Sequence, residues 1–310
     1  MTGRLFIDGQ DAFTAYGIYV TKGGWKGLVQ WAALKDIEYN DWQEEDGIEA
    51  DLSDPKLNTR EADITVAVRR LSDGYLTLNE KLSDGAYHEF DCREIGRTFK
   101  LRLVSMPSIS NIEDFGSVAI RVADDFPLEG YEYLAPQSTI FERSEDYAID
   151  DRPLTDYGAQ VLKGILSEIM KTPTVKGNLL TNINNKSGAV YDPKNVTYKS
   201  KEVKVNILMR ANSLSEFWRN YDALLYDLTR PEERTLDIID VAESYPCYYK
   251  SCQVNEFYPM NKIWLNMTLT FVFTRDFRIQ DESLLATEDD LWIVTEDTEN
   301  DFITLKPDKK

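Results

Sequence analysis

The sequence predicts a mainly β protein of the α+β class, in which two related β-sandwich or split-barrel units follow one another and each carries one flanking helix. Three observations predict this class: an internal repeat, several segments of alternating apolar and polar residues, and one amphipathic helix. A length of 310 residues leaves room for two units of about 140 residues, each large enough to bury a core of its own.

An ungapped internal repeat relates the two halves of the chain. Residues 16–69 align with residues 157–210, 141 positions later, and ten of the 54 aligned pairs are identical. Chance gives about three identities at this composition, so the excess indicates one unit built twice. The identical pairs are Tyr16/Tyr157, Gly17/Gly158, Val20/Val161, Lys22/Lys163, Gly23/Gly164, Lys35/Lys176, Gly47/Gly188, Asp51/Asp192, Glu61/Glu202 and Arg69/Arg210. Conservative pairs such as Arg60/Lys201 strengthen the stretch from 59 to 69.

Alternation of apolar and polar residues predicts strands with one buried face. In the first half the alternation covers residues 62–69, 99–104 and 118–122, and in the second half residues 203–209 and 263–274. The last segment is long for a strand. Each unit is therefore expected to contain several strands in an antiparallel arrangement.

One segment, residues 213–230, has the spacing of an amphipathic helix. Its apolar residues recur at i, i+3, i+4 and i+7, Ser213 with Glu216 forms a capping box, and Pro231 follows its end. The counterpart in the first half is predicted at residues 73–83, between Ser72 and Gly85, with a weaker apolar stripe. Each helix is expected to cover a sheet.

The predicted units are residues 1–127 and 154–278. Residues 128–153 are polar, aromatic and interrupted by proline, which is typical of a linker that crosses a surface. The motif at 123–126 resembles that at 274–277, 151 positions later, so the second unit is expected to hold ten extra residues. The acidic extension 279–310 has short apolar runs at 291–294 and 302–305, which predict a small hairpin.

Composition excludes several classes of protein. With 35 basic and 54 acidic side chains the formal net charge is −19, so high-affinity binding to a phosphate backbone is not expected. The three cysteines match no zinc or redox spacing, and we expect reduced, partly buried thiols. No run approaches the roughly 18 apolar residues of a membrane helix, so a soluble protein made in the cytoplasm is expected.

The sequence predicts no catalytic, cofactor-binding or metal site, and hence no enzyme. A nucleophile–base pair or a histidine-ligated metal would depend on His88 alone, and a structural or surface role is favoured for it. The acidic runs 44–46 and 288–290 are typical of solvated loops, and Asp46-Gly47 favours a turn.

A sugar-binding module or a glycosidase is the alternative from a different class. It would use paired carboxylates and the stacking faces of exposed tryptophans, for which the candidates are Trp25, Trp31 and Trp42. Core packing or packing between subunits is the favoured role for these side chains.

Three stretches resemble phage distal tail proteins. The opening stretch, residues 6–18, resembles the N-terminal segment of proteins in that family, and residues 217–234 resemble a second segment of theirs. Residues 40–52, followed by Thr59-Arg-Glu, are similar to the loop and ring-forming hairpin of such proteins from phages and prophages of Bacteroides-like bacteria. The resemblance covers residues 5–277 and implies two tandem tail-tube-like units.

The resemblance implies a structural virion protein, synthesised and assembled in the cytoplasm of the bacterial host. It would form a ring at the distal end of the tail and join the tail tube to the hub and the receptor-binding apparatus, with DNA only as passing cargo. A homohexamer is favoured, and a trimeric baseplate hub with pseudo-six-fold symmetry is the alternative. Candidate contacts between subunits are Trp42, Glu44, Asp46, Gly47, Ile48, Leu52, Ile183, Gly188 and Tyr191.

Overall fold

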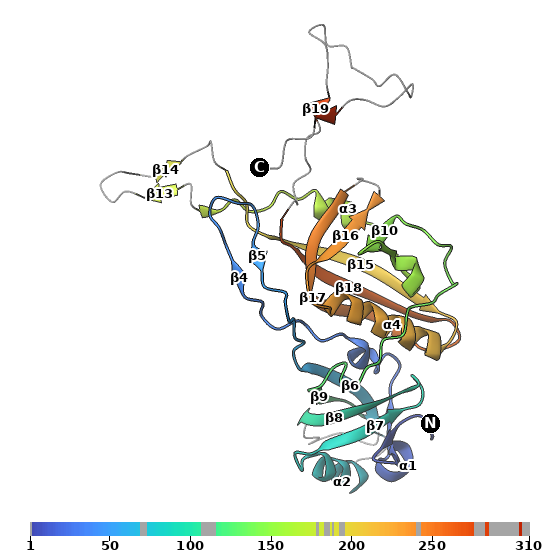
Figure 1. Cartoon of the computed structure of the whole chain (residues 1–310). Coiled ribbons are helices and arrows are strands. Elements are labelled where there is room, and N and C mark those ends of the chain that lie inside the picture. Colours follow the sequence, from blue (N-terminus) through green and yellow to red (C-terminus); the bar gives the residue numbers. More distant parts are fainter. Residues whose placement is uncertain are drawn as a thin grey trace, which may run out of the picture. The chain divides into compact units, whose positions relative to one another are not determined.

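A computed structural model gives the fold of the chain (Figure 1). It describes residues 2–68, 73–106, 116–177, 180–182, 187, 189–191, 196–239, 243–275, 283–284 and 304–305. The chain divides into two compact units, Met1–Asp276 and Phe277–Lys310. In the described residues, no helix combines the length and apolar character that crossing a membrane requires.

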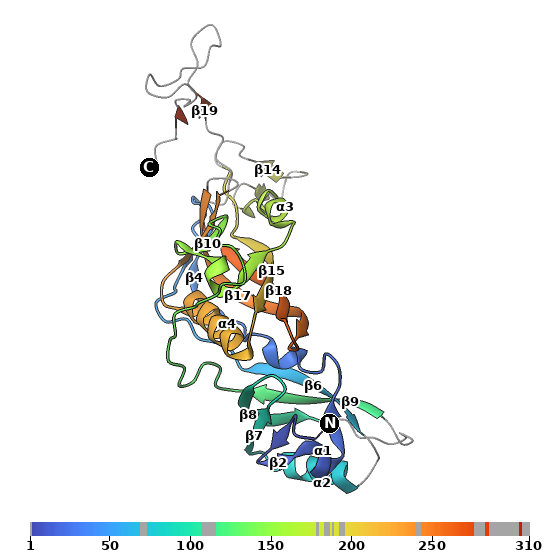
Figure 2. The ribbon, with the colours of Figure 1, turned by 90° about the vertical axis from the view of Figure 1, so that its right-hand side faces the viewer.

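The first half of the larger unit is built on one seven-stranded antiparallel sheet, in the order β2-β1-β7-β8-β9-β6-β3. Helix α1 (Ala12–Tyr16) lies beside α2 (Asp73–Leu82) (Figure 2), and the 3₁₀ turn η1 (Lys26–Val29) packs on β6. The strands are β1 (Phe6–Ile7), β2 (Gln10–Asp11), β3 (Ile18–Val20), β6 (Arg60–Val68), β7 (Tyr87–Cys92), β8 (Arg97–Ser105) and β9 (Gly116–Asp124).

The second half repeats this order strand for strand, as β11-β10-β16-β17-β18-β15-β12. Helix α4 (Leu214–Thr229) connects β15 to β16, just as α2 connects β6 to β7, and α3 (Ile165–Ile169) packs on β15. The strands are β10 (Tyr147–Ile149), β11 (Arg152–Pro153), β12 (Ala159–Val161), β15 (Lys201–Ala211), β16 (Arg234–Ile238), β17 (Glu243–Tyr258) and β18 (Ile263–Phe273), and the 3₁₀ turn η2 (Leu154–Tyr157) follows β11.

Each half also carries a separate two-stranded hairpin in the same place of its sequence. In the first half β4 (Tyr39–Asn40) pairs with β5 (Glu49–Ala50). In the second half β13 (Leu180–Asn182) pairs with β14 (Ala189–Tyr191). As far as their described residues go, neither hairpin is hydrogen-bonded into a seven-stranded sheet.

The mainly β class with flanking helices is confirmed, and every strand predicted from alternation is present. In each half the sheet curls, and its two edge strands, β2 and β3 or β11 and β12, are not paired with one another. Strands β10 and β11 belong to the second sheet although they lie in the predicted linker 128–153. They are too short to show a period in the sequence.

The offset predicted at the ends of the halves, 277 − 126 = 151, is wrong. Arg60 pairs with Asp124 and Lys201 pairs with Phe273, so the offset between the corresponding last strands is 273 − 124 = 149. The second half therefore holds eight extra residues between these strands, not ten (149 − 141 = 8). The strand register matches Asp125 with Thr274, whereas the motif alignment matches Ala123 with Thr274, two positions earlier.

In the smaller unit, β19 (Ser283–Leu284) pairs antiparallel with β20 (Thr304–Leu305). The second apolar run predicted for the C-terminal hairpin, 302–305, thus contributes a strand. The first run, 291–294, lies outside the described residues, as does Ser72 ahead of α2.

A buried cation occupies the same position in both halves. Arg60 and Lys201 are 9% and 7% exposed, and they begin the equivalent strands β6 and β15. Each donates to two backbone carbonyls of the turn that packs on that strand, and this satisfies the buried charge. The acceptors are Leu28 and Gln30 for Arg60, at 2.8 and 3.5 Å, and Ile169 and Lys171 for Lys201, the latter at 2.6 Å.

A second repeated detail is an aspartate in the tight turn between the first two strands of each sheet. Asp8 and Asp150 have φ values of 47° and 48°, and each exchanges hydrogen bonds with the neighbouring strand. Burial raises the pKa of Asp8, but hydrogen bonds from His88, Lys81 and the Glu89 amide outweigh it and lower the pKa to about 2. Asp8 therefore stabilises the fold as a carboxylate.

Helix α4 begins at the predicted capping box. The Ser213 hydroxyl accepts a hydrogen bond from the Glu216 amide at 3.1 Å, and the Glu216 carboxylate accepts one from the Asn212 amide at 3.0 Å. One face of α4 packs on β15 and β17.

The other face of α4 meets the first half. The Trp218 indole donates to the Ile95 carbonyl at 2.6 Å, and the Tyr221 hydroxyl donates to the Val29 carbonyl at 2.8 Å. The Arg97 guanidinium pairs with Asp222 at 2.8 Å. Because α4 is buried from both sides, the two halves share part of one core.

We expect Tyr221→Phe to lower the free energy of unfolding by about 1–3 kcal/mol, because it leaves the buried Val29 carbonyl without a donor. Urea unfolding measures the change. Tyr226→Phe, on the exposed side of the same helix, is the control and should have little effect. Equal stabilities of the two variants would contradict this role of α4.

The lowered pKa of Asp8 makes stability depend on pH in acid. Because its folded-state pKa lies below its ordinary value of 3.8, its contribution is complete above about pH 4 and is lost as the pH falls toward 2. We expect Asp8→Asn to flatten the fall in unfolding free energy between pH 4 and pH 2, as measured by urea unfolding. The exposed Asp36→Asn variant should keep the wild-type slope, and a wild-type slope in Asp8→Asn would disprove the assignment.

Candidate assembly site

The β4–β5 hairpin of the first half is seated on the second half. We call the second-half residues that contact the hairpin, Lys176, Thr197, Tyr198 and Thr274, the second-half seat. The amides of Gly47 and Ile48 donate to the carbonyls of Tyr198 and Thr274, at 2.8 and 2.9 Å. In return, the Tyr198 amide donates to the Asp46 carboxylate and the Thr197 hydroxyl donates to the Gln43 carbonyl, both at 2.8 Å. The contact therefore uses mostly main-chain groups of the hairpin.

Lys176 is the central polar residue of this contact. It is only 2% exposed, and its ammonium donates to the carbonyls of Trp42 and Gly47 at 2.6 and 2.8 Å. It also pairs with the Asp41 carboxylate at 2.6 Å. A buried ammonium is tolerated only with such partners, so the hairpin and the lysine depend on one another.

The tip of the hairpin turns where the sequence predicts. Gly47 has a φ of 76°, a left-handed conformation that glycine adopts without strain, and it follows Asp46 as expected for an Asp-Gly turn. Before the turn, Trp42 is 52% exposed, and its indole donates to the Glu49 carboxylate at 3.2 Å.

The nine candidate subunit contacts lie in different surroundings. Trp42 and Glu44 are exposed, whereas Asp46, Gly47 and Ile48 bind the second-half seat, and Leu52 is buried. Tyr191 ends β14, where its backbone pairs with Leu180, while Ile183 and Gly188 lie outside the described residues. That these nine residues contact another chain stays a prediction.

The residues of the second-half seat were not singled out from the sequence. They are scattered from 176 to 274, and no short motif unites them. One signal was available, because Lys176 is identical to Lys35 in the internal repeat.

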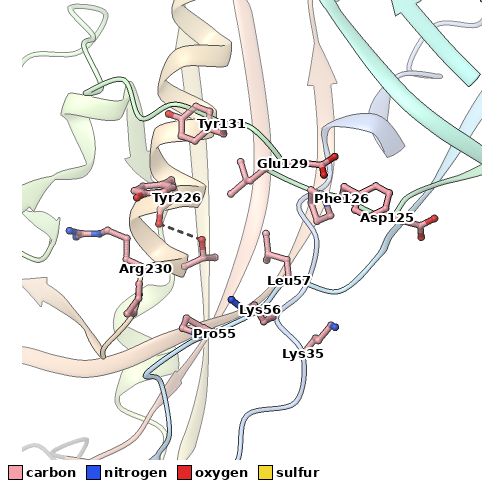
Figure 3. Close-up of a pocket in the computed structure, with 14 residues that line it drawn as sticks. Lys35, Pro55, Lys56, Leu57, Asp125, Phe126, Glu129, Tyr131, Tyr226 and Arg230 are labelled. Atoms are coloured by element: carbon pink, nitrogen blue, oxygen red, sulfur yellow. Dashed lines mark hydrogen bonds between the residues drawn. The ribbon is translucent and has the colours of Figure 1, made fainter. Parts of the chain in front are cut away.

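A cavity of about 610 Å³ lies between the first half and the end of α4 (Figure 3). Lys35, Lys56, Leu57 and Asp125 form one side, and Tyr226 and Arg230 of the α4 end form the other. The Asp125 carboxylate accepts hydrogen bonds from Arg102 and from the Tyr87 hydroxyl, and the Arg102 bond is the largest cause of its low pKa of about 2. This side therefore carries two lysines and a carboxylate beside the apolar Leu57.

The histidine and the two other tryptophans that the sequence offered as candidates for catalysis or sugar binding are buried. His88 is 5% exposed, and its two ring nitrogens lie 2.9 and 3.1 Å from the carboxylates of Asp8 and Asp84. Trp25 and Trp31 are buried, so they offer no face to a sugar. In the part of the chain that is described, no cluster of three or more His, Cys, Asp or Glu side chains is placed to hold a metal ion.

The comparisons with known proteins are sparse. No protein-family model and no curated protein matches the chain. Among solved structures, the SPP1 Dit protein, described as a paradigm of the hub adsorption apparatus in phages that infect Gram-positive bacteria, aligns with 87% of this chain and 98% of its own. The sequence identity is 11% and the TM-score is 0.29, so this likeness bears on neither the fold nor the function of this chain.

We expect Lys176→Met to destabilise the chain by about 1–3 kcal/mol, because the buried carbonyls of Trp42 and Gly47 lose their donor. Urea unfolding measures the loss, and limited proteolysis near residue 43 should become faster. Lys204→Met, on the exposed face of β15, is the matched control and should change stability by less than about 0.5 kcal/mol. A loss no larger than that of the control would refute the role of Lys176.

Proposed function

We propose that this protein is a structural, non-enzymatic component of a phage tail. It assembles with copies of itself into a ring at the distal end of the tail and joins the tail tube to the hub and the receptor-binding apparatus. Its partners are then the tail tube protein, the hub or tip protein and the receptor-binding protein. The resemblance of residues 5–277 to distal tail proteins and the repeated architecture support this proposal.

We infer that the second half arose as a copy of the first. The identical strand order, the paired cations Arg60 and Lys201, and the aspartate turns all support a common origin. The isolated bridges Leu34↔Leu57 and Val175↔Tyr198, which precede β6 and β15, are related by the same offset as the repeat (175 − 34 = 141 and 198 − 57 = 141). Unrelated sequences have no reason to match at this many independent points.

The seating of one unit's hairpin on the next unit is the observation that carries the proposal. Such a contact is directional, because a hairpin on one unit meets a seat on the following unit. Directional contacts between like units generate rings when the rotation closes. A chain that already joins two like units in this way has the geometry of an assembly component.

The composition of the exposed surface agrees with this function. Tyr39 and Trp42 on the hairpin are 58% and 52% exposed, and aromatic side chains are enriched in protein interfaces. The net charge of −19 suits a channel for DNA, because like charges discourage contact with phosphates.

Two stoichiometries fit a chain of two like units. A homohexamer uses one unit of each chain in the wall of the ring, which we favour because the halves differ in the length of their helices. A trimeric hub uses both units and has pseudo-six-fold symmetry.

We expect native mass spectrometry of the purified chain to show an assembly of six or three times the 35.7 kDa chain mass. Negative-stain images should show rings. A particle of one chain mass at all concentrations, especially one that binds glycans on an array, would contradict the proposal and favour a sugar-binding module.

A further inference from the structure

We propose that the cavity between the first half and the end of α4 contains a second seat, and that the β13–β14 hairpin of a neighbouring copy of this chain occupies it. This inference rests on the proposed function, because it requires that the chain assembles with copies of itself. We call Lys35, Lys56, Leu57 and Asp125 the first-half seat.

The first-half seat corresponds residue by residue to the second-half seat. Lys35, Lys56 and Leu57 match Lys176, Thr197 and Tyr198 at the offset of the internal repeat (176 − 35 = 141). Asp125 matches Thr274 at the offset that the strand register sets (274 − 125 = 149). All four residues line the cavity of about 610 Å³ (Figure 3).

The backbone of the two seats is built by the same short ladder. The Lys35 amide donates to the Lys56 carbonyl at 2.8 Å, and the Lys176 amide donates to the Thr197 carbonyl at 2.9 Å. One step along, Asn58 donates to Ala33 and Lys199 donates to Thr174, both at 2.8 Å. These bonds flank the bridges at Leu57 and Tyr198, so both residues direct their own amide and carbonyl away from the ladder.

The two seats differ in what they bind. The amide and the carbonyl of Tyr198 are both bonded to the β4–β5 hairpin. For Leu57, neither group has a hydrogen-bond partner among the described residues. Likewise Lys176 is buried on three acceptors, whereas Lys35 is exposed. The first-half seat thus presents a donor, an acceptor and a cation in the arrangement that binds a hairpin elsewhere in this chain.

The β13–β14 hairpin is the segment that fits this arrangement. Its pair Leu180↔Tyr191 corresponds, at the offset of 141, to the pair Tyr39↔Ala50 of the seated hairpin (180 − 39 = 141). At the same offset, its pair Asn182↔Ala189 corresponds to positions 41 and 48. Asn182, Ser187 and Gly188 stand where the seated hairpin has Asp41, Asp46 and Gly47. In the sequence, two residue types that carry side-chain acceptors and the glycine are therefore kept.

The occupant comes from another copy because the contact is directional. The first-half hairpin lies on the unit that follows it in the chain, and the first half of a neighbouring copy can serve as the following unit for the second-half hairpin. Repetition of this step is a heterologous contact, which continues until the ring closes. Both units of every chain then lie in the ring, so this contact favours the trimeric hub with pseudo-six-fold symmetry over the hexamer with one unit of each chain in the wall.

A disulfide tests this contact in the full chain. Positions 56 and 184 correspond to Thr197 and Gln43, which touch in the seated hairpin. We expect the double variant Lys56→Cys with Asn184→Cys to form covalent multimers under mild oxidation, resolved on a non-reducing gel. The matched control, Thr197→Cys with Gln43→Cys, should give an internally bridged monomer. The native Cys92, Cys247 and Cys252 are buried, and burial raises their pKa, to about 12 for Cys252, so they interfere little.

The outcomes separate this inference from the proposed function. Multimers that revert to single chains with reductant support it. If the wild-type chain assembles but the double variant at 56 and 184 forms no disulfide between chains, the proposal of the first-half seat is wrong and the proposed ring-forming function is unaffected. If the wild-type chain keeps one chain mass and no link forms, both proposals fail.

A charge reversal provides a second measurement, which does not depend on cysteine chemistry. We expect Lys35→Glu to raise the concentration for half-assembly at least about tenfold, because the repulsion replaces a contact to hairpin carbonyls. Lys204→Glu, an equal change on the exposed face of β15, should leave it unchanged. Equal assembly of both variants, with folding checked by circular dichroism, would overturn the second seat.

Discussion

The burial of helix α4 from both sides is the constraint on which the rest of the structure depends. Most α-helices on a sheet have one apolar face and one solvated face. Here Trp218 and Tyr221 extend the apolar surface of α4 around to the first half, and their polar tips find backbone carbonyls there. Because one helix completes two cores, the halves form one compact unit even though each has its own sheet.

This shared helix also explains the aromatic cluster that surrounds it. The ring of Trp31 lies 5.3 Å from that of Tyr221 and 6.0 Å from that of Tyr249, at tilted and edge-on angles that aromatic pairs prefer. The Tyr249 hydroxyl donates to the Ala32 carbonyl at 2.9 Å. The segment after η1 is thereby fixed along β17, which brings the start of the β4–β5 hairpin beside the second half.

Sequence patterns predicted the elements with a clean period and missed those without one. Strands β6, β15 and β18 bury alternate residues, and α4 has a capping box, so each was predictable from local signals. The 16-residue β17 was missed because two register shifts break its alternation and because Pro246 argues against a central strand. For the candidate site, the turn at Asp46-Gly47 was predictable from the sequence. The second-half seat was not predictable, because only tertiary contacts bring its residues together.

Recognition of the hairpin through main-chain atoms has an evolutionary consequence. The Tyr198 carbonyl, the Lys176 ammonium and the Thr197 hydroxyl bind backbone groups of the hairpin tip, which are the same whatever side chains surround them, and the Tyr198 amide adds one bond to the Asp46 carboxylate. Mutations in the tip are therefore tolerated as long as the glycine keeps the turn and the carboxylates of Asp41 and Asp46 are retained. A lineage can diversify such a loop rapidly, under pressure from changing neighbours, while the joint itself persists.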